Sequence, residues 1–262
     1  MEKNLKIIGL IAIIVIGSIS VVGFFLFYGG VFQEEGIEPS DNDERSWRLF
    51  NVGNHNFSSL TDGKVNNTYW KREIGWRLSL VGEEEGEEIR VNITVLDDTE
   101  NITIGGRNIT TRVVEEKEIE DGELVEISYN YYAICNETKD IVYFGELSIE
   151  YEDGVAVGTA GSWRAEGLNK PGILMPGNFR VGDRYWQEYA PEEAMDRGEN
   201  IGINRNFLTS IGLFNSCVIV EDSNFLEPPR GEYKVYAPEI GMIADETLVI
   251  TKYGYVTPYS RP

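Results

Sequence analysis

An uninterrupted apolar segment near the N-terminus constrains this chain more than any other feature. From Ile7 to Gln33 no residue is charged, and residues 7–28 are almost wholly apolar. A helix of that length rises about 33 Å, which is enough to cross the hydrocarbon core of a bilayer. A cleavable signal peptide has a shorter apolar region of about 7–15 residues and a small-residue cleavage site. The segment therefore predicts an uncleaved transmembrane anchor.

Charges on either side of this segment orient it. Lys3 and Lys6 precede it, whereas Glu34 and Glu35 follow it. The positive-inside rule then places the N-terminus in the cytoplasm and the body on the extracytoplasmic side of the cell membrane, as a single-pass protein. The predicted organisation is a cytoplasmic tip at 1–6, an anchor at 7–28, a polar linker at 29–45 and an extracytoplasmic domain at 46–262.

The body is strongly acidic. Asp and Glu number 44 against 23 Lys and Arg, so the net charge is −21. Such a surface repels phosphate backbones, which excludes nucleic acid as a partner. Six N-x-S/T sequons agree with an extracytoplasmic, glycosylated body, and their asparagines are glycosylation candidates: Asn56, Asn66, Asn92, Asn101, Asn108 and Asn136.

Apolar and polar residues alternate through much of the body, which is typical of β-strands. Residues 89–95 place Ile and Val at every second position, and residues 125–133 repeat the pattern. Asp121-Gly122 and Asp153-Gly154 are two-residue hairpin signals, because type I′ turns need positive φ at both central positions. These features predict a mainly β protein built as an antiparallel meander.

The second half of the body resembles the first, with repeat one at about 70–152 and repeat two at about 182–250. We therefore expect a curved antiparallel sheet, or sheets, from a duplicated β-meander, preceded by one N-terminal transmembrane helix. Four short matches keep their order at offsets of 104 to 108 residues: Asn92-Ile93 with Asn200-Ile201, Ile104-Gly105 with Ile211-Gly212, Val113-Val114-Glu115 with Ile219-Val220-Glu221, and Tyr132-Ala133 with Tyr236-Ala237.

A series of ordered motifs resembles an uncharacterised family of secreted or envelope proteins of bacteria and archaea. The resemblance covers roughly residues 76–251 and implies one continuous β-domain, but it supplies no activity and no catalytic residue. The motifs are YFGE from Tyr143, GSWRAEG from Gly161, PGILMPG from Pro171, VGDRYWQEYAPEEAMDRGE from Val181, LEP from Leu226 and EYKVYAPEIGMI from Glu232.

The inventory of reactive side chains is small. His55 is the single histidine, so histidine-based triads and multi-histidine metal sites are not expected, and it reads as an exposed loop residue. We expect no metal and no cofactor. Cys135 and Cys217 are a candidate disulfide, with buried free thiols as the competing interpretation. No motif supplies either thiol with a catalytic base.

Carboxylates and aromatic rings are the remaining candidates. An acidic cluster comprises Glu188, Glu192, Asp196 and Glu199, and it is read as structural or solvated, with Ca²⁺ ligation and acid–base hydrolysis as alternatives. Large apolar side chains between the repeats form either core or a cleft for a lipid, glycan or peptide: Trp163, Met175, Tyr185, Trp186 and Tyr189.

These observations favour a non-enzymatic binding or structural envelope protein. The alternatives are an extracytoplasmic hydrolase that uses a carboxylate cluster and a calcium-stabilised surface module. The expected partners are the lipid membrane, through the N-terminal helix, and an envelope protein, a glycan or an apolar ligand.

Overall fold

The computed structural model describes residues 47–59, 65–71, 73–226 and 231–262. Every regular element in these ranges is a β-strand, which confirms the predicted fold class at the level of a mainly β protein. The strands are β1 (Phe57–Ser58), β2 (Trp76–Glu84), β3 (Glu87–Ile104), β4 (Arg107–Glu120), β5 (Glu123–Cys135), β6 (Ile141–Glu152), β7 (Val155–Gly158), β8 (Trp163–Arg164), β9 (Gly172–Met175), β10 (Arg184–Trp186), β11 (Asp196–Thr209), β12 (Gly212–Asn224), β13 (Glu232–Ala237), β14 (Gly241–Asp245) and β15 (Leu248–Tyr255).

The predicted anchor at 7–28, its cytoplasmic tip and its linker lie outside the described residues. Within the described ranges, the structure has no helix with the length and apolar character needed to span a bilayer.

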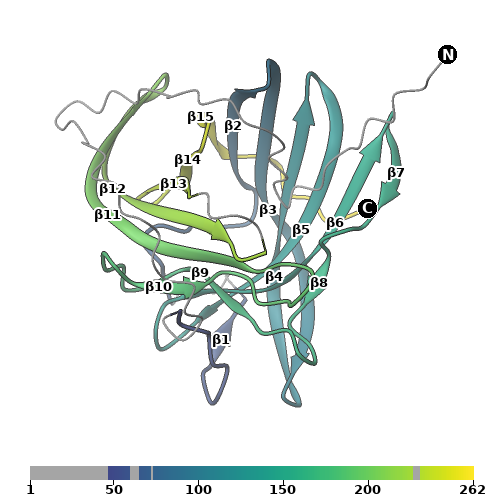
Figure 1. The fold of residues 1–262 in the computed structure, drawn as a ribbon, viewed down its shortest axis with the longest axis vertical. Coiled ribbons are helices and arrows are strands. Elements are labelled where there is room, and N and C mark those ends of the chain that lie inside the picture. Colours follow the sequence, from purple (N-terminus) through teal and green to yellow (C-terminus); the bar gives the residue numbers. More distant parts are fainter. Residues whose placement is uncertain (1–46, 60–64, 72, 227–230) are drawn as a thin grey trace.

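All fifteen strands belong to one antiparallel sheet (Figure 1). Strands β2 to β7 are neighbours in sequence order, and so are β10 to β15. The two runs join where β15 pairs with β2, from Val249 opposite Val81 to Tyr255 opposite Trp76. Strand β1 adds to β5, and β8 and β9 both add to β6. The sheet therefore consists of two runs of strands in sequence order, joined by the pairing of β15 with β2.

The two hairpin turns that the sequence predicts form at their predicted positions. Asp121 and Gly122 have φ values of 45° and 88°, and Asp153 and Gly154 have 50° and 75°. The acidic run at 83–88 turns at Glu85 and Gly86, with φ values of 51° and 92°. Positive φ at both central residues matches the right-handed twist of the flanking strands, so these local signals set the register of the long hairpins.

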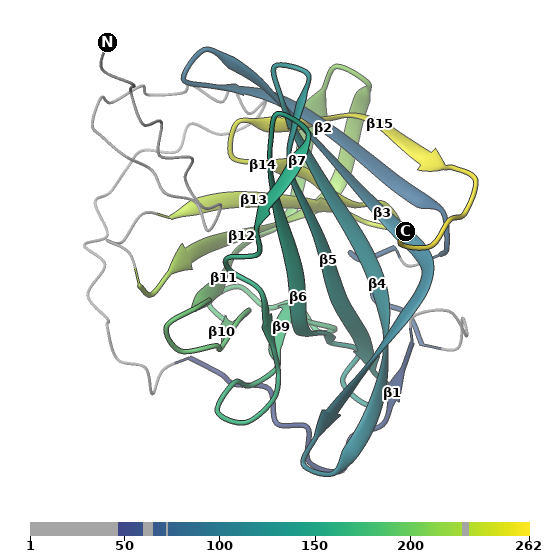
Figure 2. The same cartoon turned by 90° about the vertical axis from the view of Figure 1, so that its right-hand side faces the viewer.

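The sheet is strongly curved, and its concave face brings distant strands together (Figures 1 and 2). Trp70 contacts Tyr132 on β5 and Tyr236 on β13, with ring centroids 5.4 and 6.4 Å apart. Along the sheet, five strands lie between β5 and β13. These contacts place Trp70 between the two halves of the sheet, on the concave side.

Strand β9, which adds to β6, approaches β10 at the other end of the sheet. A Cβ atom on Gly172, in β9, would lie 1.8 Å from the carbonyl oxygen of Gln187, just after β10. Lys170 and Tyr189 form an isolated antiparallel bridge beside this contact. Glycine is therefore required at position 172, because any side chain there would collide with backbone.

Strand pairing in the two halves has corresponding registers. On β4 and β5, Val113 lies opposite Tyr131, and on β12 and β13, Ile219 lies opposite Val235. The match between Asn92 and Asn200 does not follow this register, since Asn92 pairs with Lys117 and Asn200 pairs with Val220. Both β3 and β11 contain bulges, which shift their pairing.

From Ile127 to Cys135, strand β5 is buried on both faces. Its apolar residues Tyr129 and Tyr131 lie on the convex side, where the guanidinium of Arg261 covers them at 5.7 and 5.9 Å. Its polar residues Ser128 and Asn130 lie on the concave side and are also buried. Sequence alternation separates the two faces correctly. Curvature of the sheet encloses the polar face, however, and the C-terminal segment covers the apolar one.

Candidate functional site

Carboxyl groups gather on the concave face of β4, β5 and β6. Residues directly opposite each other in paired strands share one face of a sheet. Glu116 lies opposite Ser128, which lies opposite Ser148; one step along, Glu118 lies opposite Glu126. This register, together with the alternation of each strand, projects the acidic side chains toward the opposite wall.

The opposite wall carries a charged triad. The ammonium of Lys234, on β13, lies 2.8 Å from Asp222 on β12 and 3.8 Å from Asp245 on β14. Burial favours a neutral amine, but the two carboxylates raise the pKa of Lys234 well above its ordinary value. Lys234 and Asp245 also interact electrostatically with Glu116, so the acidic groups of both walls form one electrostatic system.

The carboxyl groups on this face hold their protons to unusually high pH. Burial and repulsion by Asp245 raise the pKa of Glu116 to about 7. Burial and repulsion by Glu116 raise the pKa of Glu118 to about 8. The pKa of Glu146 is also raised to about 8, mainly by burial and then by repulsion from Glu126. Near neutral pH this face is therefore partly protonated and ionises progressively as pH rises.

Further along the same face, carboxyl groups accept hydrogen bonds from aromatic side chains. Glu146 accepts a hydrogen bond from the Tyr143 hydroxyl at 2.9 Å. The indole Nε1 of Trp163 donates to Glu188 at 3.4 Å, and Trp163 packs edge-on against Tyr143. Burial first, and then repulsion by Asp196, raises the pKa of Glu188 well above its usual range, and the two carboxyl groups share a hydrogen bond.

The predicted acidic cluster divides in the structure. Glu188 and Asp196 come together at the concave face. Glu199 forms an ion pair with Arg184 at 2.7 Å, and Glu192 is exposed to solvent. The cluster is therefore contiguous in sequence but is not one site, because Glu188 and Asp196 face inward, whereas residues 191–193 between them are exposed.

The predicted aromatic cleft also divides. Trp163, Met175 and Tyr185 are buried, and Tyr185 donates a hydrogen bond to Asn200 at 2.9 Å. Trp186 and Tyr189 pack against each other with centroids 5.2 Å apart. Three other side chains join Trp186 in a separate cluster: Trp47, Arg197 and Phe225. Trp163 is the member of the predicted cleft that reaches the acidic surface, through its hydrogen bond to Glu188.

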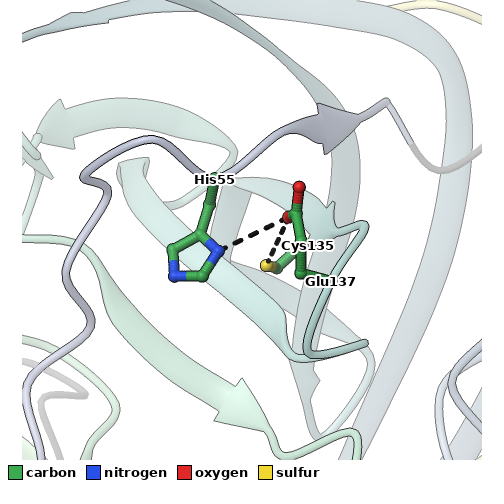
Figure 3. A group of neighbouring side chains, drawn as sticks. All are labelled: His55, Cys135 and Glu137. Atoms are coloured by element: carbon green, nitrogen blue, oxygen red, sulfur yellow. Dashed lines mark hydrogen bonds and ion pairs between the residues drawn. The ribbon is translucent and has the colours of Figure 1, made fainter.

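A second constellation lies where β1 pairs with the end of β5 (Figure 3). His55, Cys135 and Glu137 bring their ligand atoms within 4.8 Å of one another. His55 Nδ1 and Cys135 Sγ each lie 3.4 Å from Oε2 of Glu137. Desolvation opposes the shift, but hydrogen bonds from Asn56 lower the pKa of the Glu137 carboxyl to about 2.

Sequence reasoning missed this constellation. The sequence predicts that His55 is an exposed loop residue; it does precede β1 in a loop, but its side chain is 36% exposed and lies beside a thiol and a carboxylate. His55 and Cys135 are separated by about 80 residues in the chain. Their proximity depends on the pairing of the two-residue strand β1, which carries no strong alternation signal.

Both cysteines are free and buried, so the candidate disulfide is not formed in this structure and the competing arrangement is the one observed. Of the glycosylation candidates, Asn56, Asn66, Asn101 and Asn108 are exposed, whereas Asn92 and Asn136 are half-buried.

No protein-family model, curated protein or solved structure matches this chain. Its function must therefore be argued from the two sites themselves.

Proposed function

We propose that this chain is a single-pass, extracytoplasmic, non-enzymatic binding protein whose concave face receives a positively charged ligand. The N-terminal apolar segment supports the location, as the flanking charges place the body outside the cytoplasm. The binding role rests on the electrostatics of the concave face.

The observation that carries the proposal is the unbalanced charge around Glu116, Glu118 and Glu146. Their pKa values of about 7, 8 and 8 reflect burial and mutual repulsion. Lys234, the cation that interacts with Glu116, is already paired with Asp222 and Asp245. A ligand cation would relieve the repulsion and let these carboxyl groups ionise, so its binding would release protons.

Calorimetric titration of the full detergent-solubilised chain with spermidine, a small organic trication, tests this function at pH 8. The double variant Glu118→Gln/Glu146→Gln should bind at least about tenfold more weakly. The matched control Glu192→Gln/Glu193→Gln removes two exposed carboxylates and should bind within about twofold of the parent. Thermal unfolding of both variants checks that they fold.

Equal affinity in the two double variants would contradict the proposal, because binding would then depend only on overall charge. Saturable binding of Ca²⁺ without binding of spermidine would instead support the calcium-stabilised module.

A hydrolase is the second candidate, because Glu188, which is buried, and Asp196, which is half-buried, form a hydrogen-bonded carboxyl pair. Glycoside hydrolysis needs two carboxyl groups about 5–9.5 Å apart, and a hydrogen-bonded pair is closer than that. The pair also contributes to packing through Trp163. Hydrolysis of any glycan or peptide that is lost in Glu188→Gln would favour the enzyme over the binding protein.

We also propose that the domain is a duplicated meander and belongs to the envelope-protein family that its motifs resemble. The corresponding registers, with Val113 opposite Tyr131 and Ile219 opposite Val235, support the duplication. Superposing residues 89–136 on 197–240 tests the duplication, because at least three strands should then align in order and direction. A mismatch in strand order or strand direction would contradict it.

A further inference from the structure

The constellation of His55, Cys135 and Glu137 has the donors of a transition-metal site. It contains an imidazole nitrogen, a thiol sulfur and a carboxylate oxygen, which are the three ligand types that zinc takes in proteins. Figure 3 shows the three side chains turned toward one another from two separate segments. His55 precedes β1, whereas Cys135 ends β5 and Glu137 lies in the turn that follows.

Strand pairing and hydrogen bonds hold the two segments in place. Phe57 lies opposite Cys135 in the β1–β5 pair, and the Asn136 amide donates to the Asn56 carbonyl at 2.8 Å. Arg107 donates to the backbone carbonyl oxygens of Gly53 and His55 at 2.7 and 2.6 Å. The histidine loop is thus fixed before any ion binds, which lowers the ordering cost of binding.

The carboxylate is oriented by its own partner. Asn56 donates to Glu137 from its backbone amide, at 3.1 Å to Oε2, and from its side-chain amide, at 2.9 Å to Oε1. Outer-shell hydrogen bonds of this kind orient metal ligands, and their loss typically weakens metal binding about 10–100-fold.

We propose that His55, Cys135 and Glu137 bind one Zn²⁺ ion through one nitrogen, one sulfur and one oxygen, with a fourth position open to water. Zinc bonds of about 2.0–2.3 Å in a tetrahedron place neighbouring ligand atoms about 3.3–3.8 Å apart. The contacts from Nδ1 and Sγ to Oε2, both 3.4 Å, have that spacing.

Access and ligand type both favour this ion. Cys135 is fully buried, whereas the side chains of His55 and Glu137 are 36% and 43% exposed. An ion therefore approaches from solvent past these two side chains and reaches the sulfur beneath them. The thiol releases its proton to solvent as the zinc–sulfur bond forms. Thiolate and imidazole select Zn²⁺ over Ca²⁺ and Mg²⁺, which prefer oxygen ligands alone.

Titration with Co²⁺, a coloured substitute for Zn²⁺, tests the site in the reduced full chain. Excess Mg²⁺ is added to occupy the many surface carboxylates, because the net charge of −21 favours nonspecific binding. We expect a thiolate-to-cobalt charge-transfer band that saturates at one equivalent and disappears when one equivalent of Zn²⁺ is added.

Variants assign the ligands. Cys135→Ser should abolish the band, and His55→Gln should weaken binding at least about tenfold. Cys217→Ser removes the other buried thiol and should leave the band unchanged. His55→Gln changes a half-exposed side chain, so it remains informative if Cys135→Ser fails to fold. A band that persists in His55→Gln at full affinity, a band lost in Cys217→Ser, or no band at all would overturn the proposal.

Discussion

The ammonium of Lys234 lies 2.8 Å from the carboxylate of Asp222, on the wall of the concave face opposite Glu116. The Lys234 side chain is 25% exposed and that of Asp222 is 9% exposed, so water screens the pair only weakly. This pair joins β12 to β13, and Lys234 balances the charge of Asp222 in the folded protein.

Lys234→Met should destabilise the protein strongly. The change leaves the buried Asp222 and the half-buried Asp245 without their cation, and breaking a buried pair on one side costs about 3–5 kcal/mol. Urea denaturation at pH 8 measures the free energy of unfolding. The control Lys252→Met removes an exposed lysine of β15 and should change it by less than about 0.5 kcal/mol. A loss of under about 1 kcal/mol in Lys234→Met would show that the pair is not needed.

Stability should fall as pH rises from 5 to 9. The folded pKa of Glu118 is about 8 and its ordinary value is 4.5, so folding favours the protonated form. The stability that this carboxyl group contributes is fully present below its unfolded pKa and is lost as pH rises through about 8. Glu116 and Glu146 act in the same direction, with pKa values of about 7 and 8.

Glu118→Gln should therefore remove part of this pH dependence. We expect it to raise the free energy of unfolding by about 1–3 kcal/mol at pH 9 and to leave it nearly unchanged at pH 5. Glu192→Gln, at an exposed position, is the matched control and should follow the parent at both pH values. Denaturant melts at several pH values measure the effect, and a parent protein that becomes more stable toward pH 9 would contradict it.

Arg261 should contribute to stability more than an ordinary surface arginine. It donates to Asp98 at 2.7 Å and to Glu100 at 2.9 Å, and it covers the rings of Tyr129 and Tyr131. Because all three charged side chains are at most 25% exposed, Arg261→Ala should lower the free energy of unfolding by about 1–3 kcal/mol.

The control for this change is Arg90→Ala. Arg90 pairs with Glu88 at 3.1 Å, but the two side chains are 43% and 59% exposed. Solvent screening makes such a pair worth less than about 1 kcal/mol. Chemical denaturation of both variants compares them directly. Equal losses of unfolding free energy would show that Arg261 contributes no more than an ordinary surface arginine.

The proposed membrane anchor should remain attached to the mature protein. The uncharged span from Ile7 to Gln33 is longer than a signal-peptide core, and its flanking charges favour the proposed orientation with the N-terminus inside. Intact-mass measurement of membrane-extracted protein should give a mass that includes residues 1–30, after allowance for glycans. A mature N-terminus near residue 30 would show that the segment is a cleaved signal peptide.

Local signals predicted much of the β architecture. Asp121-Gly122 and Asp153-Gly154 impose turns whose geometry depends on only a few residues, and the alternation at 125–133 identifies the two faces of β5. Hairpins join strands that are adjacent in sequence, so their pairing follows from these signals. The pairing of β15 with β2 brings together residues such as Tyr255 and Trp76, and no local pattern predicts it.

By itself, the sequence determined the β-strands, their hairpin turns and the separation of polar from apolar faces. Tertiary structure alone decided which parts of those faces are enclosed and which side chains lie opposite one another. Curvature of the sheet enclosed Glu116, Glu118 and Glu146 opposite Lys234, so side chains with the pattern of a solvent-facing surface acquired raised pKa values. The pairing of β1 with β5 likewise placed His55 beside Cys135. Both results depend on contacts between residues far apart in the chain, whereas turn geometry and side-chain alternation act only between near neighbours.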